Sequence, residues 1–542
     1  MMKSYNKFMA GDIESLKQRV DGLDVWDHIL EASKVGFSAV DQELVPLFKW
    51  YGIYAQKPKE DGFFMMRIKV PGGQLTSKQV CKLSDLGKRY AHGVIDITTR
   101  QAVQMHWLRI EDIPTIVSEL HDVQMDVVGG CGDVTRNVTG CPLAGLIDDE
   151  IFDASKELLE IDGFMTRNRD FSNLPRKYKM SVTGCSHWCS QPDINCVSLV
   201  AVHHPETNEK GFTLKVGGGL STKPIIAKNF PVFINREQAK DVITAVTTVY
   251  RDNGFRDKRH KARIKFLVED WGVEKFLEET EKVLGYQLER VSLLRIMVTG
   301  AEEYFPSPKE SHGDHLGITK LKNGNYAVGI AFVSGRTYLP DLDNVAKLAE
   351  EFSLTSEVRT TNKQNLILVN VPEFKLEACL KKAMEYGLKV EYSAFTKLGV
   401  ACTGTEFCNL AIVETKARAK ELFNYLDEAF PDFREELMIS VTGCPNNCAQ
   451  YSIADIGLVG CKVKDELSGE MQDAFRIFLG GRLADEAQFG KPLDGRFLHK
   501  EIHLTLKKLF NFYKSSRTNG EEFRHFIDRL GIEKIQQELT AC

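Results

Sequence analysis

The stretch SVTGCPNNCAQ, residues 440–450, places Cys444 and Cys448 with three residues between them. A second pair, Cys402 and Cys408, lies upstream in ACTGTEFCNLA, residues 401–411, which gives the pattern C-x5-C-x35-C-x3-C. Four thiolates can bind one tetrahedral metal ion or a [4Fe–4S] cluster. Structural zinc sites typically pair ligands about two to four residues apart, so the five-residue spacing favours a cluster and leaves zinc as the alternative.

Each cysteine pair is expected at the start of a helix. Pro445 suits a first helical turn, where its missing N–H loses no hydrogen bond. Backbone N–H groups at a helix N-terminus direct positive potential at a thiolate-rich cluster. Cys444 and Cys448 would then lie one turn apart on the same helix face.

The cysteine stretch has an earlier copy in the chain. SVTGCSHWCSQPDINCVSLVAV at 181–202 parallels SVTGCPNNCAQYSIADIGLVGC at 440–461, 259 residues later. Two further pairs of matching segments occur in the same order: 211–221 with 474–484, and 97–114 with 359–372. These matches indicate a duplicated half of about 260 residues, which is too long for a solenoid repeat.

Both halves begin with the same pattern of strands and helices. The first copy predicts a strand at 62–70, a helix at 77–91, strands at 94–99 and 102–108, and a helix from Asp112. This is the β-α-β-β-α order of a ferredoxin-like split unit. The second copy predicts a strand at 325–332, a helix after Asp341, strands near 357–361 and 365–371, and a helix from Pro372.

A cysteine-bearing segment follows each ferredoxin-like unit. It contains short β-branched strands, Gly-rich turns and long helices. The strands are expected at 178–184, 196–202 and 212–218 in the first half, and at 437–442, 452–459 and 475–479 in the second.

Length and composition limit the classes of function. A chain of 542 residues is too long for one core and predicts about two to four domains. Its formal net charge of -5 does not indicate a nucleic-acid partner. The N-terminus lacks the apolar core of a secretory signal, and no apolar run approaches the roughly 18 residues of a membrane span. We therefore expect a soluble, cytoplasmic protein with no membrane partner, in which clustered cysteines serve metal or redox chemistry.

The segments CTGTEFC and TGCPNNC resemble the cluster motif of the siroheme-dependent nitrite/sulfite reductases, ferredoxin-dependent assimilatory type. The resemblance extends from about residue 45 to 515. It implies an α+β fold in which ferredoxin-like half-domains and siroheme/iron–sulfur α/β domains form a duplicated, pseudo-twofold arrangement. It also implies that Cys402, Cys408, Cys444 and Cys448 hold one [4Fe–4S] cluster, and that the Cys448 thiolate bridges to the siroheme iron.

The resemblance divides the chain into five segments. They are an N-terminal helical extension (1–45), a first ferredoxin-like half-domain (46–125), a first siroheme-binding domain (126–300), a second ferredoxin-like half-domain (310–395) and a [4Fe–4S]/siroheme domain (396–542).

Basic residues beside the repeated motifs are the candidates for binding siroheme carboxylates and a small oxyanion. Taken singly, each is an ordinary surface cation. Lys177 and Lys179 occupy alternate positions of an expected strand and so point to one face. The resemblance implies that Arg67, Arg136, Lys177 and Lys179 surround the open face of the siroheme, bind the anion and relay protons.

Other positions are implied as cofactor contacts. Arg100 and Gln101, which close DITTRQ, resemble residues that touch the siroheme. The glycines of Gly217–Gly219 and of Gly481–Leu483 are expected to let the backbone approach the macrocycle.

The implied reaction is the six-electron reduction of sulfite to sulfide. No G-x-G-x-x-G opens a βαβ unit, so an external one-electron donor, ferredoxin, is expected. Plant and cyanobacterial nitrite-type members of the family carry Asn where this chain has Lys179, and a second cation suits a dianion, so sulfite is favoured. Reduction of nitrite to ammonia is the alternative, and a non-catalytic iron–sulfur or zinc protein is the alternative outside the enzyme class. The family implies a monomer.

The remaining cysteines pose a separate question. Cys131, Cys141, Cys185 and Cys189 are spaced x9, x43 and x3 in the first half. They could hold a second cluster, or they are a relic of the duplication that packs as small hydrophobes. Three lone cysteines are expected to be bystanders: Cys81, Cys379 and Cys542.

One basic segment stands apart from the repeated motifs. RDKRHKARIK at 256–265 is interpreted as a solvated helix face, with a docking patch for an acidic electron donor as the alternative.

Overall fold

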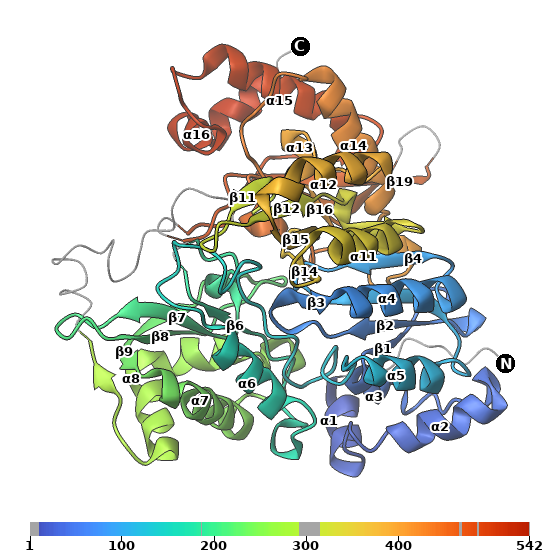
Figure 1. The fold of residues 1–542 in the computed structure, drawn as a ribbon, viewed down its shortest axis with the longest axis vertical. Helices are drawn as coiled ribbons and strands as arrows, with labels where there is room; N and C mark the ends of the chain where they lie inside the picture. Colours follow the sequence, from blue (N-terminus) through green and yellow to red (C-terminus); the bar gives the residue numbers. More distant parts are fainter. Residues whose placement is uncertain (1–9, 186, 292–314, 465–468, 485–486, 541–542) are drawn as a thin grey trace.

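The computed structural model describes residues 10–185, 187–291, 315–464, 469–484 and 487–540. In these residues the chain forms four sheets flanked by helices, and the two halves lie against each other (Figure 1). Two sheets belong to the ferredoxin-like units and two to the cysteine-bearing segments. This arrangement is the predicted duplicated α+β fold. The predicted bystander Cys542 lies outside the described residues.

The first ferredoxin-like unit follows the predicted order closely. Alternation in β2 turns Phe64, Met66 and Ile68 into the core, and Arg67 out of it. Thr76 and Gln79 form a capping box that starts α4. The elements are β1 (Ile53–Ala55), β2 (Phe64–Ile68), α4 (Ser77–Tyr90), β4 (Val94–Ile97), β5 (Val103–Leu108) and α5 (Ile113–Asp122).

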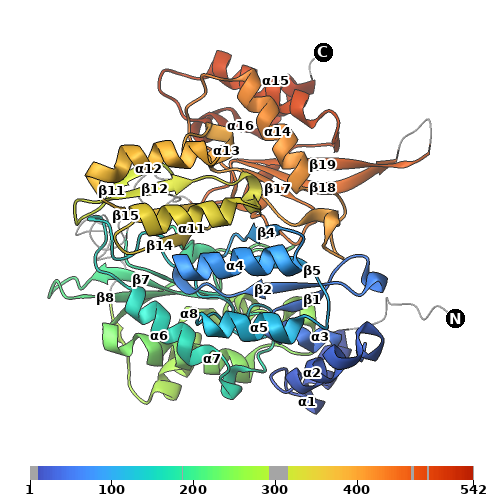
Figure 2. The same cartoon turned by 45° about the vertical axis from the view of Figure 1, so that its right-hand side comes forward.

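The second unit repeats this order, and its predicted elements are confirmed. The two units share one hydrophobic core, and α4 packs beside α11 (Figure 2). The elements are β11 (Ile318–Lys320), β12 (Tyr326–Ile330), α11 (Asp341–Phe352), β14 (Glu357–Thr360), β15 (Leu366–Val371) and α12 (Glu373–Glu385).

The two units exchange a strand. β3 (Gln74–Thr76) belongs to the first half but pairs with β14 of the second, with Val358 opposite Leu75. β13 (Arg336–Tyr338) belongs to the second half but pairs with β4 of the first, with Thr337 opposite Ile95. The resulting sheets have the orders β1-β2-β5-β4-β13 and β11-β12-β15-β14-β3. The sheet of each unit is therefore completed by one strand from the other unit.

The first cysteine-bearing domain is a five-stranded sheet of order β10-β9-β8-β7-β6 covered by helices. Its core is separate from that of the ferredoxin-like units. The elements are β6 (Met180–Thr183), β7 (Val197–His203), β8 (Lys210–Val216), β9 (Lys228–Ile234), β10 (Glu289–Arg290), α6 (Ser155–Met165), α7 (Ala239–Asn253) and α8 (Ile264–Leu284).

The second cysteine-bearing domain has the same plan and its own core. Its sheet runs β16-β17-β18-β19-β20, with β21 paired to β19. The elements are α13 (Ala394–Lys397), β16 (Val400–Ala401), α14 (Lys416–Ala429), β17 (Ile439–Thr442), β18 (Ile456–Lys464), β19 (Met471–Leu479), β20 (Lys491–Pro492), β21 (Phe497–Leu498), α15 (Ile502–Ser516) and α16 (Phe523–Thr540).

The N-terminal segment is helical where the structure describes it, with α1 (Ala10–Arg19), α2 (Trp26–Val35) and α3 (Val45–Phe48). It docks on the first half: Lys17 lies 3.4 Å from Asp133, and the Trp50 indole N–H donates to Ser172 O at 2.6 Å. Among the described helices, none combines the length and apolar character needed to cross a bilayer.

Equivalent turns of the two halves meet in the interior of the molecule. Gln191 and Gln450 stand at matching positions of the repeat, and both adopt left-handed backbone conformations, with φ of 55° and 67°. Their side-chain amides form a reciprocal pair: Gln191 Nε2 donates to Gln450 Oε1 at 3.0 Å, and Gln450 Nε2 donates to Gln191 Oε1 at 2.6 Å. Both residues are buried. The pair marks the point where the pseudo-twofold halves join.

Candidate active site: four thiols beside a set of unpaired cations

Two adjacent parallel strands bring the predicted cluster cysteines together. β16 pairs in parallel with β17, so the segments that follow them, with Cys402 and Cys444, leave the same sheet edge. The backbone N–H of Gly443 donates to the Cys402 thiol sulfur at 3.2 Å, and that of Leu410 donates to the Cys408 sulfur at 3.4 Å. Burial and then the charge of Cys448 raise the pKa of the Cys402 thiol to about 12. Positive charge, such as that of a metal centre, would lower it again.

The cysteine pairs lie on turns, so the prediction that each begins a helix is wrong. Residues 444–449 form successive turns, and Asn447 and Gln450 have φ of 63° and 67°, which no α-helix contains. Gly404, between Cys402 and Cys408, also has a left-handed φ of 69°. Such turns direct several backbone N–H groups to one side, which serves a thiolate-rich group as a helix terminus would.

Cys448 differs from the other three thiols because it is exposed, whereas Cys444 is buried and Cys402 and Cys408 are partly buried. Its carbonyl accepts from Thr99 Oγ1 at 3.2 Å, which connects it to the turn that carries Arg100. Its charge also acts on Arg67 and Lys177. Cys448 therefore lies between the other thiols and the predicted cations.

Arg67 extends from β2 toward Cys448. Its guanidinium donates to Gln104 Oε1 at 2.6 Å and to the Cys131 thiol at 3.0 Å. Burial opposes its charge, but Cys131, Tyr54 and Cys448 raise the pKa of Arg67 above its usual value. Tyr54 lies beside it, with the ring 5.8 Å from the guanidinium carbon, and was missed in the sequence because tyrosine on a strand is commonplace.

Arg136 and the two lysines enter from neighbouring segments. Arg136 N donates to Tyr178 O at 2.8 Å, so the backbone pairs Arg136 with the segment that carries Lys177 and Lys179. Tyr178 is buried and both lysines are half-buried, which fits the predicted alternation. Burial and then Arg176 and Arg263 lower the pKa of Lys177 to about 7. Burial, Arg100 and Lys177 lower the pKa of Lys179 well below its usual value.

Arg100 is bound entirely by neutral groups. Its guanidinium donates to Asn195 Oδ1 at 2.7 Å and to Asn137 O at 2.8 Å. Burial is the largest effect on Arg100, and with Arg136 and Arg263 it lowers the pKa to about 9. Its Nε is buried without a hydrogen-bond partner among the described residues.

Gln101 does not face the same space. It is fully buried, and its amide donates to Thr360 O at 3.0 Å and accepts from Gly140 N at 3.0 Å. Thr360 Oγ1 donates back to Gln101 O at 2.7 Å. These contacts favour a role in fixing the turn that holds Arg100, in place of the direct cofactor contact predicted for Gln101.

The basic segment 256–265 is not the solvated helix face that was predicted, and the alternative of a docking patch stays a prediction. Residues 254–263 form a loop with one short 3₁₀ turn before α8, and several of its cations point inward. Arg259 binds Asp133 at 2.8 Å. Arg263 donates to the Cys196 thiol at 3.2 Å, and Lys265 donates to Leu220 O at 2.9 Å. Arg263 and Lys265 therefore belong to the site. The sequence did not reveal this, because a run of charged residues does not indicate which of them are buried.

The predicted glycines serve the protein's own packing. A Cβ at Gly219 would lie 2.4 Å from Arg263 Nη2, and one at Gly218 would lie 2.4 Å from Asp193 O. A Cβ at Gly481 would meet Ser452 O at 2.7 Å. These contacts give each glycine a reason within the protein itself, and the expectation that they admit a macrocycle stays a prediction.

The cations of this site share one property. Among the described residues, no carboxylate lies within ion-pair distance of any of them, and their partners are carbonyls, amides, thiols or none. Their mutual repulsion and burial lower the pKa values of the lysines. A large anionic ligand would remove this electrostatic penalty. The members are Arg67, Arg100, Arg136, Lys177, Lys179, Arg263 and Lys265.

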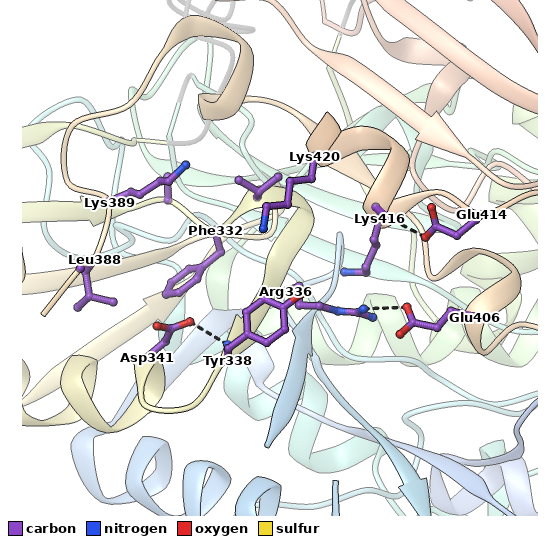
Figure 3. Close-up of a pocket in the computed structure, with 14 residues that line it drawn as sticks. Phe332, Arg336, Tyr338, Asp341, Leu388, Lys389, Glu406, Glu414, Lys416 and Lys420 are labelled. Atoms are coloured by element: carbon purple, nitrogen blue, oxygen red, sulfur yellow. Dashed lines mark hydrogen bonds and ion pairs between the residues drawn. The ribbon is translucent and has the colours of Figure 1, made fainter. Parts of the chain in front are cut away.

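A separate cavity of about 480 Å³ adjoins the cluster loop at Glu406 (Figure 3). Arg336, Lys389, Lys416 and Lys420 line it. Arg336 binds Glu406, which lies between Cys402 and Cys408, at 2.7 Å. The residues that line this cavity include none of the four thiols and none of the unpaired cations.

Family models match almost the whole of both repeats. A model described as the nitrite and sulphite reductase 4Fe-4S domain matches residues 131–288 and 399–541, and one described as the nitrite/sulfite reductase ferredoxin-like half domain matches 55–123 and 319–386. The chain belongs to the nitrite/sulfite reductase family. Members of this family are oxidoreductases, so the alternative of a non-catalytic protein is not supported.

Individual relatives match over nearly their full length. "Sulfite reductase [ferredoxin] 1" of Mycolicibacterium paratuberculosis is 34% identical, covering 97% of this chain and 96% of the relative. "Assimilatory ferredoxin-dependent nitrite reductase" of Haloferax mediterranei is 33% identical, covering 98% and 93%. The solved structure of the Mycobacterium tuberculosis NirA protein superposes with a TM-score of 0.90 at 32% identity over 97% of both chains. The named activities divide between the two substrates at similar identity.

The residues present fit the cofactors of this family. Four thiols lie on two neighbouring turns, as a [4Fe–4S] cluster requires. Beside them lie seven cations without carboxylate partners among the described residues. Two of their buried guanidinium nitrogens, Arg100 Nε and Arg263 Nε, have no hydrogen-bond acceptor there. A macrocycle with many carboxylates, such as siroheme, would supply those acceptors.

Proposed function

We propose that this chain catalyses the six-electron reduction of sulfite to sulfide, with siroheme coupled to a [4Fe–4S] cluster and with ferredoxin as the electron donor. The observation that carries the proposal is the set of cations without carboxylate partners, gathered beside the exposed thiol of Cys448. An electron-transfer protein without an anionic substrate has no use for so many uncompensated charges.

Each part of the site has a task in this reaction. Cys402, Cys408, Cys444 and Cys448 would hold the cluster, and Cys448 would also bind the siroheme iron. When bound, the siroheme supplies the metal that takes the substrate and delivers electrons to it. Arg100, Arg263 and Lys265 would bind the carboxylates of the macrocycle.

Arg67, Arg136, Lys177 and Lys179 would bind and polarise the oxyanion. Fixed positive charge offsets the negative charge that builds on its oxygens, and it needs no reorganisation during the reaction. Lys177, with a pKa lowered to about 7, can also release a proton at neutral pH as each oxygen leaves as water.

The donor assignment rests on the relatives. Those from Mycolicibacterium paratuberculosis and Haloferax mediterranei are both named for ferredoxin. Cys408, which is only partly buried, lies close to the surface, and the basic lining of the cavity in Figure 3 adjoins the same loop. A short path from the surface to the cluster suits a protein donor of one electron at a time.

The preference for sulfite over nitrite rests on Lys179. Lys177 and Lys179 together offer two cations on one face, which matches a dianion better than a monoanion. Nitrite remains the second candidate, because relatives named for nitrite are as similar as those named for sulfite.

The test is a comparison of kcat/KM for sulfite and for nitrite, with reduced ferredoxin or viologen as donor. Wild type should favour sulfite, and Lys179→Asn should shift the ratio toward nitrite by roughly tenfold, since a charge-assisted hydrogen bond contributes about 1.5–3 kcal/mol. Lys258→Asn, at an exposed loop position, is the control and should leave the ratio unchanged.

Two results would contradict the proposal at different levels. A wild-type ratio that favours nitrite, unmoved by Lys179→Asn, would show that Lys179 does not decide the substrate. Absence of turnover with either anion in protein that contains siroheme would refute the reductase activity itself.

A further inference from the structure

A second group of thiols lies in the first half, away from the unpaired cations. His315 Nε2 lies 3.2 Å from the sulfur of Cys189 and 3.6 Å from that of Cys141, and the ligand atoms of these three residues all lie within 4.8 Å of one another. The thiol of Cys185 contacts those of both Cys141 and Cys189. All three cysteines are buried. Two buried thiols and one imidazole therefore converge, and the buried thiol of Cys185 packs beside both sulfurs without belonging to that tight group of three.

The duplication explains how three of these residues came together. Cys185 and Cys189 stand where the second half has Cys444 and Cys448. Thr139 forms a parallel bridge to Ser181 of β6, just as β16 pairs with β17, so Cys141 leaves the sheet edge as Cys402 does.

The fourth ligand position differs between the halves. No cysteine follows Cys141 at the five-residue spacing of Cys402 and Cys408. His315, which precedes β11 of the second half, occupies that side of the group instead. Cys131, the other candidate for a second cluster, is bound to Arg67 in the cation site and is not a member.

The spacing suits one metal ion. A tetrahedral zinc ion with Zn–S of about 2.3 Å and Zn–N of about 2.0–2.1 Å places sulfur and nitrogen ligands roughly 3.5 Å apart. The two measured sulfur–nitrogen distances, 3.2 and 3.6 Å, bracket this value. A [4Fe–4S] cube binds each thiolate through a different iron and spreads its ligands farther. Among the described residues, Cys402, Cys408, Cys444 and Cys448 do not gather so tightly.

The surroundings suit a closed, structural site. Apolar side chains from both halves enclose the thiols, among them Leu143, Ile147, Leu321 and Ile367. Asn362 Nδ2 donates to the carbonyl of Cys189, which fixes the ligand backbone. Thiols packed only as small hydrophobes would not need an imidazole nitrogen directed at two of them.

We propose that Cys141, Cys185, Cys189 and His315 bind one structural zinc ion. The ion fastens the first cysteine-bearing domain to the strand that opens the second half. The neighbouring contacts join the same two parts: Lys322 N donates to Leu146 O at 2.9 Å, and Lys322 Nζ pairs with Glu150 at 2.7 Å. The cluster proposed for the second half transfers electrons, whereas the zinc ion at the corresponding place in the first half would be redox-inert.

The first test uses the wild-type holoenzyme. Elemental analysis should find about one zinc per chain beside the iron of siroheme and one cube. X-ray absorption at the zinc edge should show three sulfurs at about 2.3 Å and one nitrogen at about 2.0 Å. Absence of zinc in metal-replete protein, about four additional irons, or a shell without sulfur would each overturn the proposal.

The second test uses variants of the full chain. Cys141→Ser and His315→Gln should each lower the zinc content roughly tenfold or more, while iron content and the siroheme absorbance stay at the wild-type level. The matched controls are Cys379→Ser, a buried thiol in another core, and His187→Gln, whose ring lies 5.6 Å from that of His315. Both should retain zinc.

The outcomes separate this site from the proposed reductase. Loss of zinc from a ligand variant that retains siroheme and iron supports the zinc site, whether or not that variant reduces sulfite. Zinc that remains in both ligand variants, or thiol titration that reveals a disulfide among the three cysteines, would refute it. If a variant does not fold, the absorption spectrum of the wild type still decides the ligand set.

Discussion

Lys177, in the proposed active site, has a pKa near neutral pH. Its ammonium has no carboxylate partner among the described residues, and it lies near Arg136, Arg176, Arg263 and Cys448. Burial and the neighbouring cations lower its pKa to about 7, so the side chain is charged below that pH and neutral above it. Bound anionic groups would raise this value.

The pH dependence of the reaction should follow from this residue. Nitrite itself does not titrate near neutrality. We expect kcat/KM for nitrite to decline as the pH rises above the pKa of Lys177, which is about 7 or, with anionic groups bound, higher. The reason is that neutral Lys177 neither attracts the anion nor donates a proton. Lys177→Arg, which stays charged, should move the decline to higher pH, and Lys258→Arg should not. A decline at the same pH in Lys177→Arg would assign it to another group.

At this scale the sequence predicted the residues that stand next to a motif. Arg67, Arg136, Lys177 and Lys179 were predicted from their places beside the repeated motifs. In the structure the charges of Arg136 and Lys179 lie near that of Lys177, and the roles of all four stay a prediction. Arg263 and Lys265 were missed because burial inside a charged run depends on the tertiary fold. His315 was missed because its partners, Cys141 and Cys189, lie far away in the sequence.

Asp96 on β4 joins elements of both halves near the cluster loop. It is buried and binds Arg336 of β13 at 3.0 Å, Lys416 at the start of α14 at 3.2 Å and His106 of β5 at 3.3 Å. Burial opposes its ionisation, but Lys416, His106 and Arg336 outweigh burial and hold the pKa of Asp96 far below its usual value. The exchanged strand β13 is thus fixed by charge as well as by backbone pairing.

Removing this carboxylate should destabilise the fold strongly. Asp96→Asn leaves Lys416 buried without a counterion and Arg336 with Glu406 as its one remaining carboxylate partner among the described residues, so we expect the free energy of unfolding to fall by about 3–5 kcal/mol. Because the folded-state pKa is depressed, this stabilisation is complete above the unfolded value of about 3.8 and is lost as pH falls below it. Urea unfolding at neutral pH measures the difference.

The control is a surface ion pair on α4. Asp85 binds Arg89 at 2.7 Å and is half-exposed, so Asp85→Asn should change the free energy of unfolding by less than about 1 kcal/mol. Equal losses in the two variants would contradict the special role of Asp96.

Elements with a strong pattern were predicted correctly, and short ones were not. α4, β5, α11 and β15 follow their apolar periodicity within a residue or two of the prediction. β3 and β13 have three residues each, too few to carry a period, and their partners lie in the opposite half. The cysteine turns were mistaken for helices because Pro445 fits both, whereas the left-handed φ of Asn447 depends on local hydrogen bonds.

For the molecule as a whole, the halves meet through a shared hydrophobic core, two exchanged strands and a pair of buried amides. Gln191 and Gln450 form hydrogen bonds with each other's side-chain amides across the two halves. A buried amide that loses its partner costs about 1–3 kcal/mol, whereas replacing both partners costs less than the sum. The pair is therefore suited to a double-mutant cycle.

We expect Gln191→Ala and Gln450→Ala to be non-additive. Each single variant should lower the free energy of unfolding by about 1–3 kcal/mol, and the double variant should lose at least about 1 kcal/mol less than the two losses combined. Urea unfolding of the four proteins measures this coupling. Strict additivity would show that the reciprocal pair does not contribute to the joining of the halves.

The strand exchange between the ferredoxin-like units has a consequence for the integrity of the chain. β3 and β13 cross between the halves in opposite directions, as the arms of a domain-swapped dimer do. A break in the chain between β10 and β11 would remove the covalent link between the halves and leave both strand pairings in place. The two fragments should then co-elute in size-exclusion chromatography and dissociate only in denaturant. The single chain thus retains between its halves an interface like that between two separate subunits.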